Sequence, residues 1–135
     1  MREILFRGKR AIDGKLVYGD YHKFTYTTSG TVLVTTHYIM GRTPIYKAPI
    51  LVDPTTVGQY TGLTDKKGVK IFEGDILSVE NPKPFRAAIV CVKFEGGRWT
   101  AGVMDLYELP EQWPCTVIGN IHENPELLDE EESKC

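Results

Sequence analysis

Short stretches in which apolar and polar residues alternate dominate the sequence, and turn-forming residues separate them. Val, Ile, Thr and Tyr are frequent in these stretches, and they suit the half-buried, pleated surface of a β-sheet. We find no segment long enough for a helix that crosses over a parallel sheet. The pattern therefore predicts an all-β protein with a complex antiparallel multi-sheet fold, a partial β-barrel and short helical turns.

The first 27 residues are predicted to form a hairpin. Residues 4–12 lead into Asp13-Gly14, and residues 16–27 return. Asp-Gly supports the positive φ angles of a two-residue type I′ turn, whose twist matches that of paired strands. Apolar and aromatic residues fall on both faces of the returning strand, so we expect both faces to be covered by another layer or by a second subunit. A further strand is predicted over residues 31–39.

A second hairpin is the clearest element of the sequence. It joins residues 87–95 to residues 98–104 through Gly96-Gly97. Short helical turns are predicted at Asp53-Pro54 and Asn124-Pro125, because Asp and Asn can accept the first backbone N–H groups of a helix and Pro suits its first position.

Length and composition indicate one ordinary globular domain over residues 1–135. Of the 135 residues, 41% are hydrophobic and 25% are charged, and no apolar stretch approaches the roughly 18 residues of a membrane-spanning helix. We therefore expect no membrane association. Residues 129–135 form an acidic tail that we expect to be frayed.

The cysteine pattern bears on the cellular compartment. Cys91, Cys115 and Cys135 are an odd number, widely spaced, and form no CxxC pair. This spacing makes a disulfide framework or a thiolate zinc site a poor interpretation, and reduced thiols fit a cytoplasmic protein. Cys91 lies in an apolar run and is predicted to be buried.

Motifs at residues 6–10, 17–20, 52–63, 72–76 and 117–128 together resemble the YopX family of phage and prophage proteins. The resemblance spans about residues 5–128, and the second half of the third motif and the whole closing motif are its most specific parts. It implies an all-β, partly barrel-like fold, an origin in a phage or prophage of a bacterial host, and oligomerisation. It implies no reaction. Residues 31–51 match no motif and are expected to be the variable part of this YopX-like domain.

Candidate chemistry is sparse. His22, His37 and His122 share no local metal-ligand spacing, no serine lies in a nucleophile motif, and no glycine-rich phosphate loop is present. We therefore predict no catalytic residue, no metal site and no cofactor.

A pair of carboxylates leaves one enzymatic alternative. Glu73 and Asp75 are two residues apart, so on an extended strand they would share a face and could split their pKa values for acid and base work. A hydrolase built on Glu73, Asp75 and His122 is the weakest of our hypotheses. Gly74 favours a bend instead, at which Asp75 would bind backbone N–H groups.

Nucleic-acid binding is the more serious alternative. Basic residues cluster around the first hairpin and aromatic residues interleave with them, as in small β-barrels that bind single strands. Residues 1–125 carry a formal charge of only +2, which favours solvated lysines and aromatics in a core or an interface. The residues concerned are Arg7, Lys9, Arg10 and Lys15 with Tyr18, Tyr21, Phe24 and Tyr26.

We therefore predict a non-enzymatic phage or prophage accessory protein that acts as a homo-oligomer through macromolecular binding. Its expected partners are further copies of itself and a phage or host protein, with nucleic acid as the alternative. The candidate interaction residues are Arg7, Lys9, Arg10, Tyr18, Tyr21, Gln59, Tyr60, Glu73, Asp75, His122, Glu123 and Asn124.

Overall fold

A computed structural model of the chain describes residues 3–41, 48–80, 88–102, 104–109 and 113–128. The chain divides into two compact units, residues 1–59 and 60–135, which are described separately below. Among these residues every sheet pairing is antiparallel and the helical elements are three single 3-10 turns, so the predicted all-β fold is confirmed. Among the described residues, no helix has the length and apolar character needed to cross a membrane. That residues 1–135 form a single domain stays a prediction.

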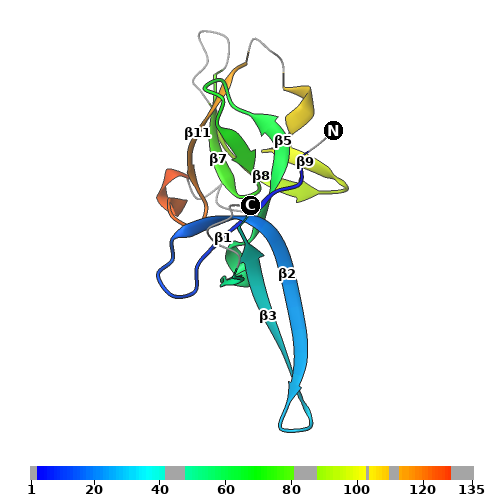
Figure 1. The fold of residues 1–135 in the computed structure, drawn as a ribbon. Helices are drawn as coiled ribbons and strands as arrows, with labels where there is room; N and C mark the ends of the chain where they lie inside the picture. The colour runs from blue at the N-terminus through cyan, green and yellow to red at the C-terminus, as the bar shows by residue number, and fades with distance from the viewer. Residues whose placement is uncertain (1–2, 42–47, 81–87, 103, 110–112, 129–135) are drawn as a thin grey trace. The chain divides into compact units, whose positions relative to one another are not determined.

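Unit 1 contains one sheet with the strand order β4-β3-β2-β1-β5 (Figure 1). A single 3-10 turn, η1 (Pro54–Thr56), follows β4, and the Asp53 side chain caps it by accepting a hydrogen bond from Thr55 N at 3.0 Å. This confirms the helical turn predicted at Asp53-Pro54. The strands are β1 (Phe6–Lys9), β2 (Leu16–Thr28), β3 (Val32–Met40), β4 (Ile50–Leu51) and the first residues of β5 (Gly58–Thr64).

The loop between β1 and β2 corrects the predicted type I′ turn. Lys9 pairs with Leu16, so the connection is six residues long rather than two. Arg10 closes it, because Arg10 N donates to Lys15 O at 2.9 Å and Gly14 N donates to Arg10 O at 2.8 Å. The Asp13 carboxylate accepts from Lys15 N at 3.0 Å and so stabilises the wider loop.

Beyond its base, the β2–β3 hairpin is a two-stranded ribbon. Asp20–Thr28 pair with Val32–Met40, whereas β1 accompanies β2 only at residues 16–19 and β4 accompanies β3 only at residues 38–39. We call the paired residues 20–28 and 32–40 the ribbon. Most of its side chains are exposed. The expected second layer over the ribbon is therefore not present in the described part of unit 1.

Unit 2 contains the remainder of β5 paired with β6, and a five-stranded sheet of order β10-β9-β8-β7-β11. In the part of the chain that the structure describes, neither sheet closes on itself. Two further 3-10 turns are η2 (Leu106–Glu108) and η3 (Pro125–Leu127). The strands are β6 (Lys70–Phe72), β7 (Asp75–Val79), β8 (Ala88–Glu95), β9 (Arg98–Ala101), β10 (Met104–Asp105) and β11 (Cys115–Asn120).

Buried apolar residues cover both faces of the five-stranded sheet: a larger cluster lies on one face, and Ile76, Cys91 and Leu128 form a smaller one on the other. The predicted second hairpin is confirmed as β8–β9, and both turn glycines adopt the positive φ angles of a tight turn, +62° at Gly96 and +79° at Gly97. The larger cluster joins the sheet to β6 and η2, and burial of its apolar side chains is the main force that stabilises this packing. Its buried members are Ile71, Leu77, Val79, Val92, Trp99, Ala101 and Leu106.

The cysteines differ from the expectation of reduced thiols. Cys91 is buried, as predicted, but it is disulfide-bonded. Cys115 carries a free thiol. Cys135 and the acidic tail 129–135 lie outside the described residues.

Candidate interaction site

The strand register sorts the side chains of the ribbon onto two faces. Residues that pair directly share a face, and successive residues alternate. One face therefore carries Phe24, Tyr26, Val32, Val34 and Tyr38, and we call it the apolar face. It also carries Asp20, His22, Thr28, Thr36 and Met40.

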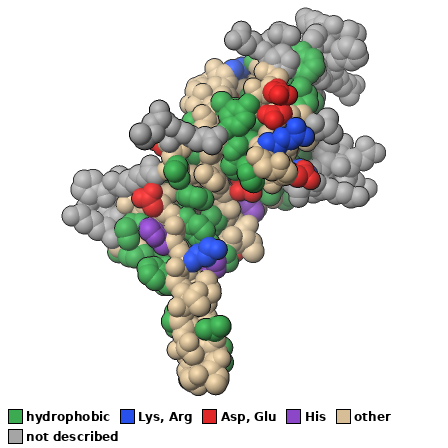
Figure 2. Space-filling model, turned by 90° about the vertical axis from the view of Figure 1, so that its right-hand side faces the viewer, with side chains coloured by type: hydrophobic (Ala, Val, Ile, Leu, Met, Phe, Trp, Pro, Cys, Tyr) green, Lys and Arg blue, Asp and Glu red, His purple; other side chains and the backbone are tan. Residues whose placement is uncertain are grey.

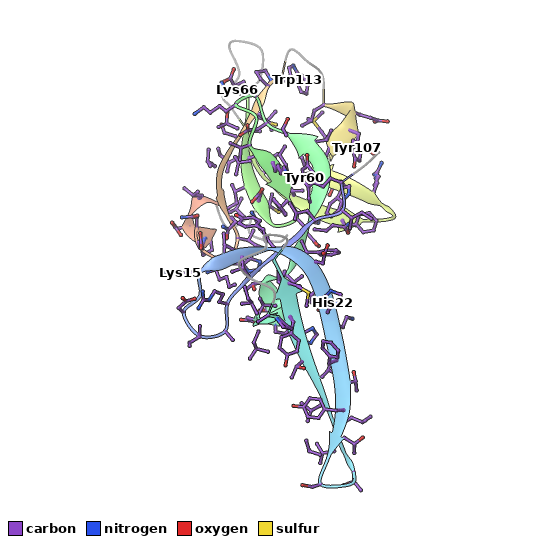
Figure 3. The ribbon with its side chains drawn as sticks, in the orientation of Figure 1. Lys15, His22, Tyr60, Lys66, Tyr107 and Trp113 are labelled. Carbon is purple, nitrogen blue, oxygen red and sulfur yellow. The ribbon has the colours of Figure 1, made fainter. Side chains whose placement is uncertain are left out.

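The apolar face is exposed along most of β2, whereas its residues on β3 are half-buried except for Val32. Phe24 and Val32 are each 55% exposed and Tyr26 is 47% exposed. Phe24 packs against Tyr38 edge-to-face at a centroid distance of 5.6 Å, which orders the two rings but leaves their outer surfaces uncovered. Contiguous exposed apolar residues on a soluble protein usually mark an interaction site. The side chains along the ribbon can be followed in Figure 3.

The opposite face is mostly polar. Thr25 and Thr35 share a hydrogen bond of 3.0 Å, and Lys23 pairs with His37. Nearer the base, the Tyr21 hydroxyl is 2.5 Å from Nδ1 of His37, and burial raises the pKa of Tyr21. The aliphatic members of this face are Leu33 next to the hairpin tip, which is exposed, and Ile39 at the base, which is buried. The ribbon is therefore amphipathic, and its two faces differ in the partners that they suit.

The predicted basic cluster is unevenly exposed, because Arg7 is buried, Lys9 and Arg10 are half-buried and Lys15 is exposed. Arg7 is only 6% exposed, and Arg10 Nε lies 3.3 Å from Oδ1 of Asp13 in an ion pair. Lys9 is half-buried, and its backbone N–H donates a hydrogen bond to Oγ1 of Thr56 at 2.9 Å. Tyr18 is exposed on β2 and pairs with Arg7, but Tyr21 is already engaged with His37.

The predicted pair Gln59 and Tyr60 falls at the boundary between the two units. Gln59 pairs with Phe6 in the sheet of unit 1. Tyr60 is buried in unit 2, where its ring packs against Phe72 at 5.6 Å and lies 5.3 Å from the ammonium group of Lys70. Both residues support local structure by these contacts.

The two most acidic motif segments meet in unit 2. Asp75 pairs with Asn120 in the β7–β11 ladder, and a Cβ placed on Gly74 would lie 3.7 Å from Nε2 of His122. The structure thus brings His122 beside the Glu73-Gly74-Asp75 turn. Asp75 is 1% exposed and its Oδ2 accepts a hydrogen bond from Phe72 N at 2.7 Å, which is the bend-stabilising role predicted for it.

The turn after β11 is also held by side chains that bind the backbone. Oδ1 of Asn120 accepts from His122 N at 3.0 Å and from Glu123 N at 2.9 Å, while its amide group donates to Glu123 Oε2 at 3.3 Å. The prediction that the Asn124 side chain caps η3 is wrong. Oδ1 of Asn124 instead accepts from Asn120 N at 3.3 Å, and η3 starts at Pro125 without a side-chain cap. We interpret this motif as a structural turn.

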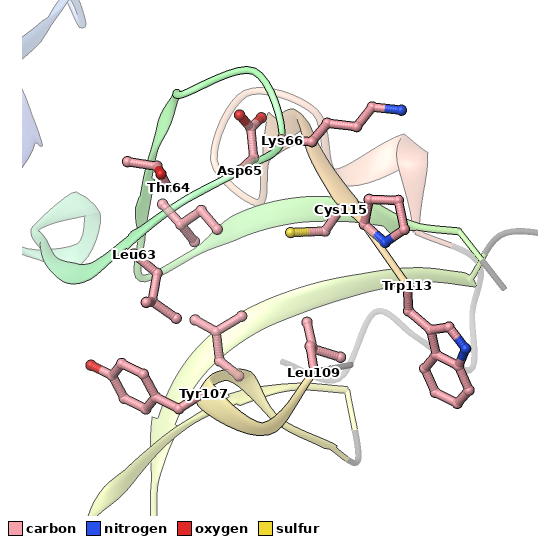
Figure 4. A pocket seen from close by; sticks show the side chains of 11 residues that line it. Leu63, Thr64, Asp65, Lys66, Tyr107, Leu109, Trp113 and Cys115 are labelled. Carbon is pink, nitrogen blue, oxygen red and sulfur yellow. The ribbon is translucent and has the colours of Figure 1, made fainter. Parts of the chain in front are cut away.

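A cavity of about 320 Å³ in unit 2 was not predicted from the sequence. Leu63, Ile71, Leu106 and Leu109 provide apolar walls, and Figure 4 shows the sulfur of Cys115 pointing into the space. Further lining residues are Thr64, Asp65, Lys66, Tyr107, Trp113 and Pro114.

Asp65 beside this cavity carries a buried charge that the backbone stabilises. Burial raises its pKa, but hydrogen bonds from the backbone N–H groups of Val117, Val69 and Lys67, with the charge of Lys67, outweigh that effect and lower the pKa below its usual value. Burial and then the Asp65 charge raise the pKa of the Cys115 thiol. A thiol held protonated is a poor nucleophile.

Among the described residues, no group of three or more His, Cys, Asp and Glu side chains is arranged to hold a metal ion. The fold is all-β and built of antiparallel sheets, and it carries the partly exposed apolar face of the ribbon. The chain belongs to the YopX family, since the family model described as "YopX protein" matches residues 5–129.

A solved structure supports the same fold. The crystal structure of protein EF1440 from Enterococcus faecalis is similar with a TM-score of 0.57 and 25% sequence identity, over 96% of this chain and 100% of that one. No curated protein matches the chain.

Proposed function

We propose that the protein is a non-enzymatic phage or prophage accessory protein that acts in the bacterial cytoplasm as a homo-oligomer and binds another macromolecule. The observation that carries the proposal is the exposed apolar face of the ribbon. An uncovered row of aromatic and aliphatic side chains costs solubility unless a partner covers it. Closed assemblies of identical chains are the commonest way to cover such a surface.

Light scattering coupled to size exclusion tests the assembly. We expect a mass that rises above the 15.2 kDa of one chain as the loading concentration increases through the micromolar range. A mass that stays at one chain over that whole range would contradict the proposal.

The macromolecular partner is tested by affinity capture from phage-infected host cells, with and without nuclease. Capture of a protein that survives nuclease treatment supports the proposal. Capture that nuclease abolishes supports nucleic acid as the partner instead.

Nucleic-acid binding is the second candidate function, and one observation favours it. Residues 1–59 contain eight Lys and Arg against four Asp and Glu, whereas residues 60–135 contain eight against fourteen. Unit 1 is therefore basic and unit 2 acidic. If unit 1 binds phosphates, the logarithm of the affinity for single or double strands falls linearly with the logarithm of the salt concentration. Absence of binding at low salt excludes this candidate.

A further inference from the structure

The low charge of the ribbon restricts the kinds of partner that can bind it. Between Leu16 and Met40 the chain carries one lysine, Lys23, and one aspartate, Asp20, so with neutral histidines its net charge is zero. On the face that Figure 2 draws, the end of the ribbon at the β2–β3 turn is tan and green, without blue or red side chains. A polyanion gains nothing from such a surface, because phosphate binding depends on neutralising cations. The positive charge of unit 1 lies elsewhere, mainly around the β1–β2 loop.

Apart from Asp20 at its base, the apolar face carries no Lys, Arg, Asp or Glu, because Lys23 lies on the opposite face. Such a surface is complementary to another of the same kind. A second copy of the apolar face meets this requirement, because aromatic rings pack well on aromatic and β-branched neighbours and no like charges meet. A two-fold axis makes such a contact self-complementary, since each residue i that contacts j is matched by j contacting i.

We propose, resting on the oligomeric function above, that two copies associate by packing the apolar faces of their ribbons together about a two-fold axis. The nine residue pairs of the ribbon extend over about 31 Å at 3.4 Å per residue, and two strands with their flanks are about 10 Å wide. The contact therefore covers roughly 300 Å² on each copy, against about 800 Å² per partner in a standard stable interface. The association is accordingly reversible and depends on concentration.

Neighbouring residues on opposite faces provide a matched test. Tyr26→Asp places a charge on the apolar face, and Thr27→Asp places the same charge one residue further on the opposite face. Both residues are exposed, and circular dichroism checks that both variants fold. We expect Tyr26→Asp to raise the dissociation constant of the dimer at least about tenfold, as for a central interface residue, and Thr27→Asp to leave it within about threefold.

Disulfide trapping supplies an independent readout. The central pair of the ribbon is Phe24–Thr36, so a two-fold axis through the middle of the apolar face brings Thr36 next to its own copy. In a Cys115→Ser background, we expect Thr36→Cys to form a cross-linked dimer on mild oxidation. Thr35→Cys, which lies on the opposite face, stays monomeric on a non-reducing gel. Equal cross-linking of the two variants contradicts the proposed interface.

The outcomes separate the two proposals. If the unmodified chain is monomeric throughout the micromolar range, both fail. If it is oligomeric and Tyr26→Asp has no effect, only the ribbon interface fails. Apolar association changes little with salt, whereas an oligomer held by basic unit 1 against acidic unit 2 of another copy weakens as salt rises. Loss of the oligomer at high salt with indifference to Tyr26→Asp therefore overturns the ribbon interface in favour of that charged contact.

Discussion

The ribbon of unit 1 and the β7–β8 pair of unit 2 are both antiparallel and rich in apolar residues, yet they bury their side chains to very different degrees. Ile76 and Leu77 on β7 are completely buried, whereas Phe24 and Val32 are more than half exposed. The difference arises from what lies beside each pair. β7 is flanked by β8 and β11 and packs into a core, while the distal ribbon has only its own two strands. Apolar alternation thus predicts a strand but not whether the strand is covered.

The largest expected change in the free energy of unfolding comes from truncating one apolar side chain in the β7–β8 pair, compared with one on the ribbon. Leu77→Ala removes a fully buried side chain from the core of unit 2 and should lower the free energy of unfolding by about 2–5 kcal/mol. Phe24→Ala loses little beyond its contact with Tyr38 and should cost roughly 0.5–1.5 kcal/mol. Urea unfolding measures both, and equal losses would show that the ribbon is covered after all.

Following urea unfolding by both tryptophan fluorescence and circular dichroism also tests the prediction that residues 1–135 form a single domain. Both tryptophans, Trp99 and Trp113, lie in unit 2, so their fluorescence reports on that unit, whereas circular dichroism reports on both. Coincident transitions indicate one cooperative domain. Two separated transitions show that the units unfold independently.

A smaller effect is expected at the buried carboxylate of unit 2, which has no counterpart on the ribbon. Asp65→Asn removes a charge that accepts three backbone N–H groups and should cost about 1–3 kcal/mol at neutral pH. Because folding lowers the pKa of Asp65 below its usual value of 3.8, its contribution is complete above that pH and is lost as the pH falls through the lower folded value. The difference between the two proteins should therefore be constant near neutrality and shrink in acid. A difference that grows in acid would contradict this assignment.

The smallest change in the free energy of unfolding is expected at an ion pair of unit 2 that is exposed to solvent, as the ribbon is. Lys66 forms an ion pair with Glu80, and both side chains are about half exposed. Such pairs contribute little because water screens them, so Lys66→Ala should change the free energy of unfolding by about 0.5 kcal/mol or less. Thermal unfolding of Lys66→Ala, Glu80→Ala and the double variant measures the coupling between the two side chains. A coupling above about 1 kcal/mol would show that the pair is shielded from water.

Local chemistry explains which parts of the fold could be predicted. The β8–β9 hairpin and the η1 turn follow from Gly96-Gly97 and Asp53-Pro54, whose conformational preferences act over a few residues. The six-residue loop before β2 could not be predicted, because the Asp13 carboxylate suits a wide loop as well as a tight turn. Dipeptide signals determine that a chain turns more reliably than how.

The candidate site was harder to predict because its exposure depends on distant parts of the chain. Alternation along β2 places Tyr21 and Phe24 on opposite faces, as the sequence predicts, but which face stays exposed depends on the segments beside the strand. Asp65, Cys115 and Trp113 gather at one cavity only after β11 has joined the sheet. Pairing between segments so far apart leaves no periodic signal in a single sequence.

The Asp65 carboxylate has a consequence for the order in which unit 2 assembles. One of its oxygens binds its own turn, at Lys67 and Val69, and the other binds Val117, 52 residues later in the chain. Closing a loop of that length costs entropy before any contact rewards it. We therefore expect the turn to organise early, with one carboxylate oxygen still bound to water, and β11 to dock onto it late in folding.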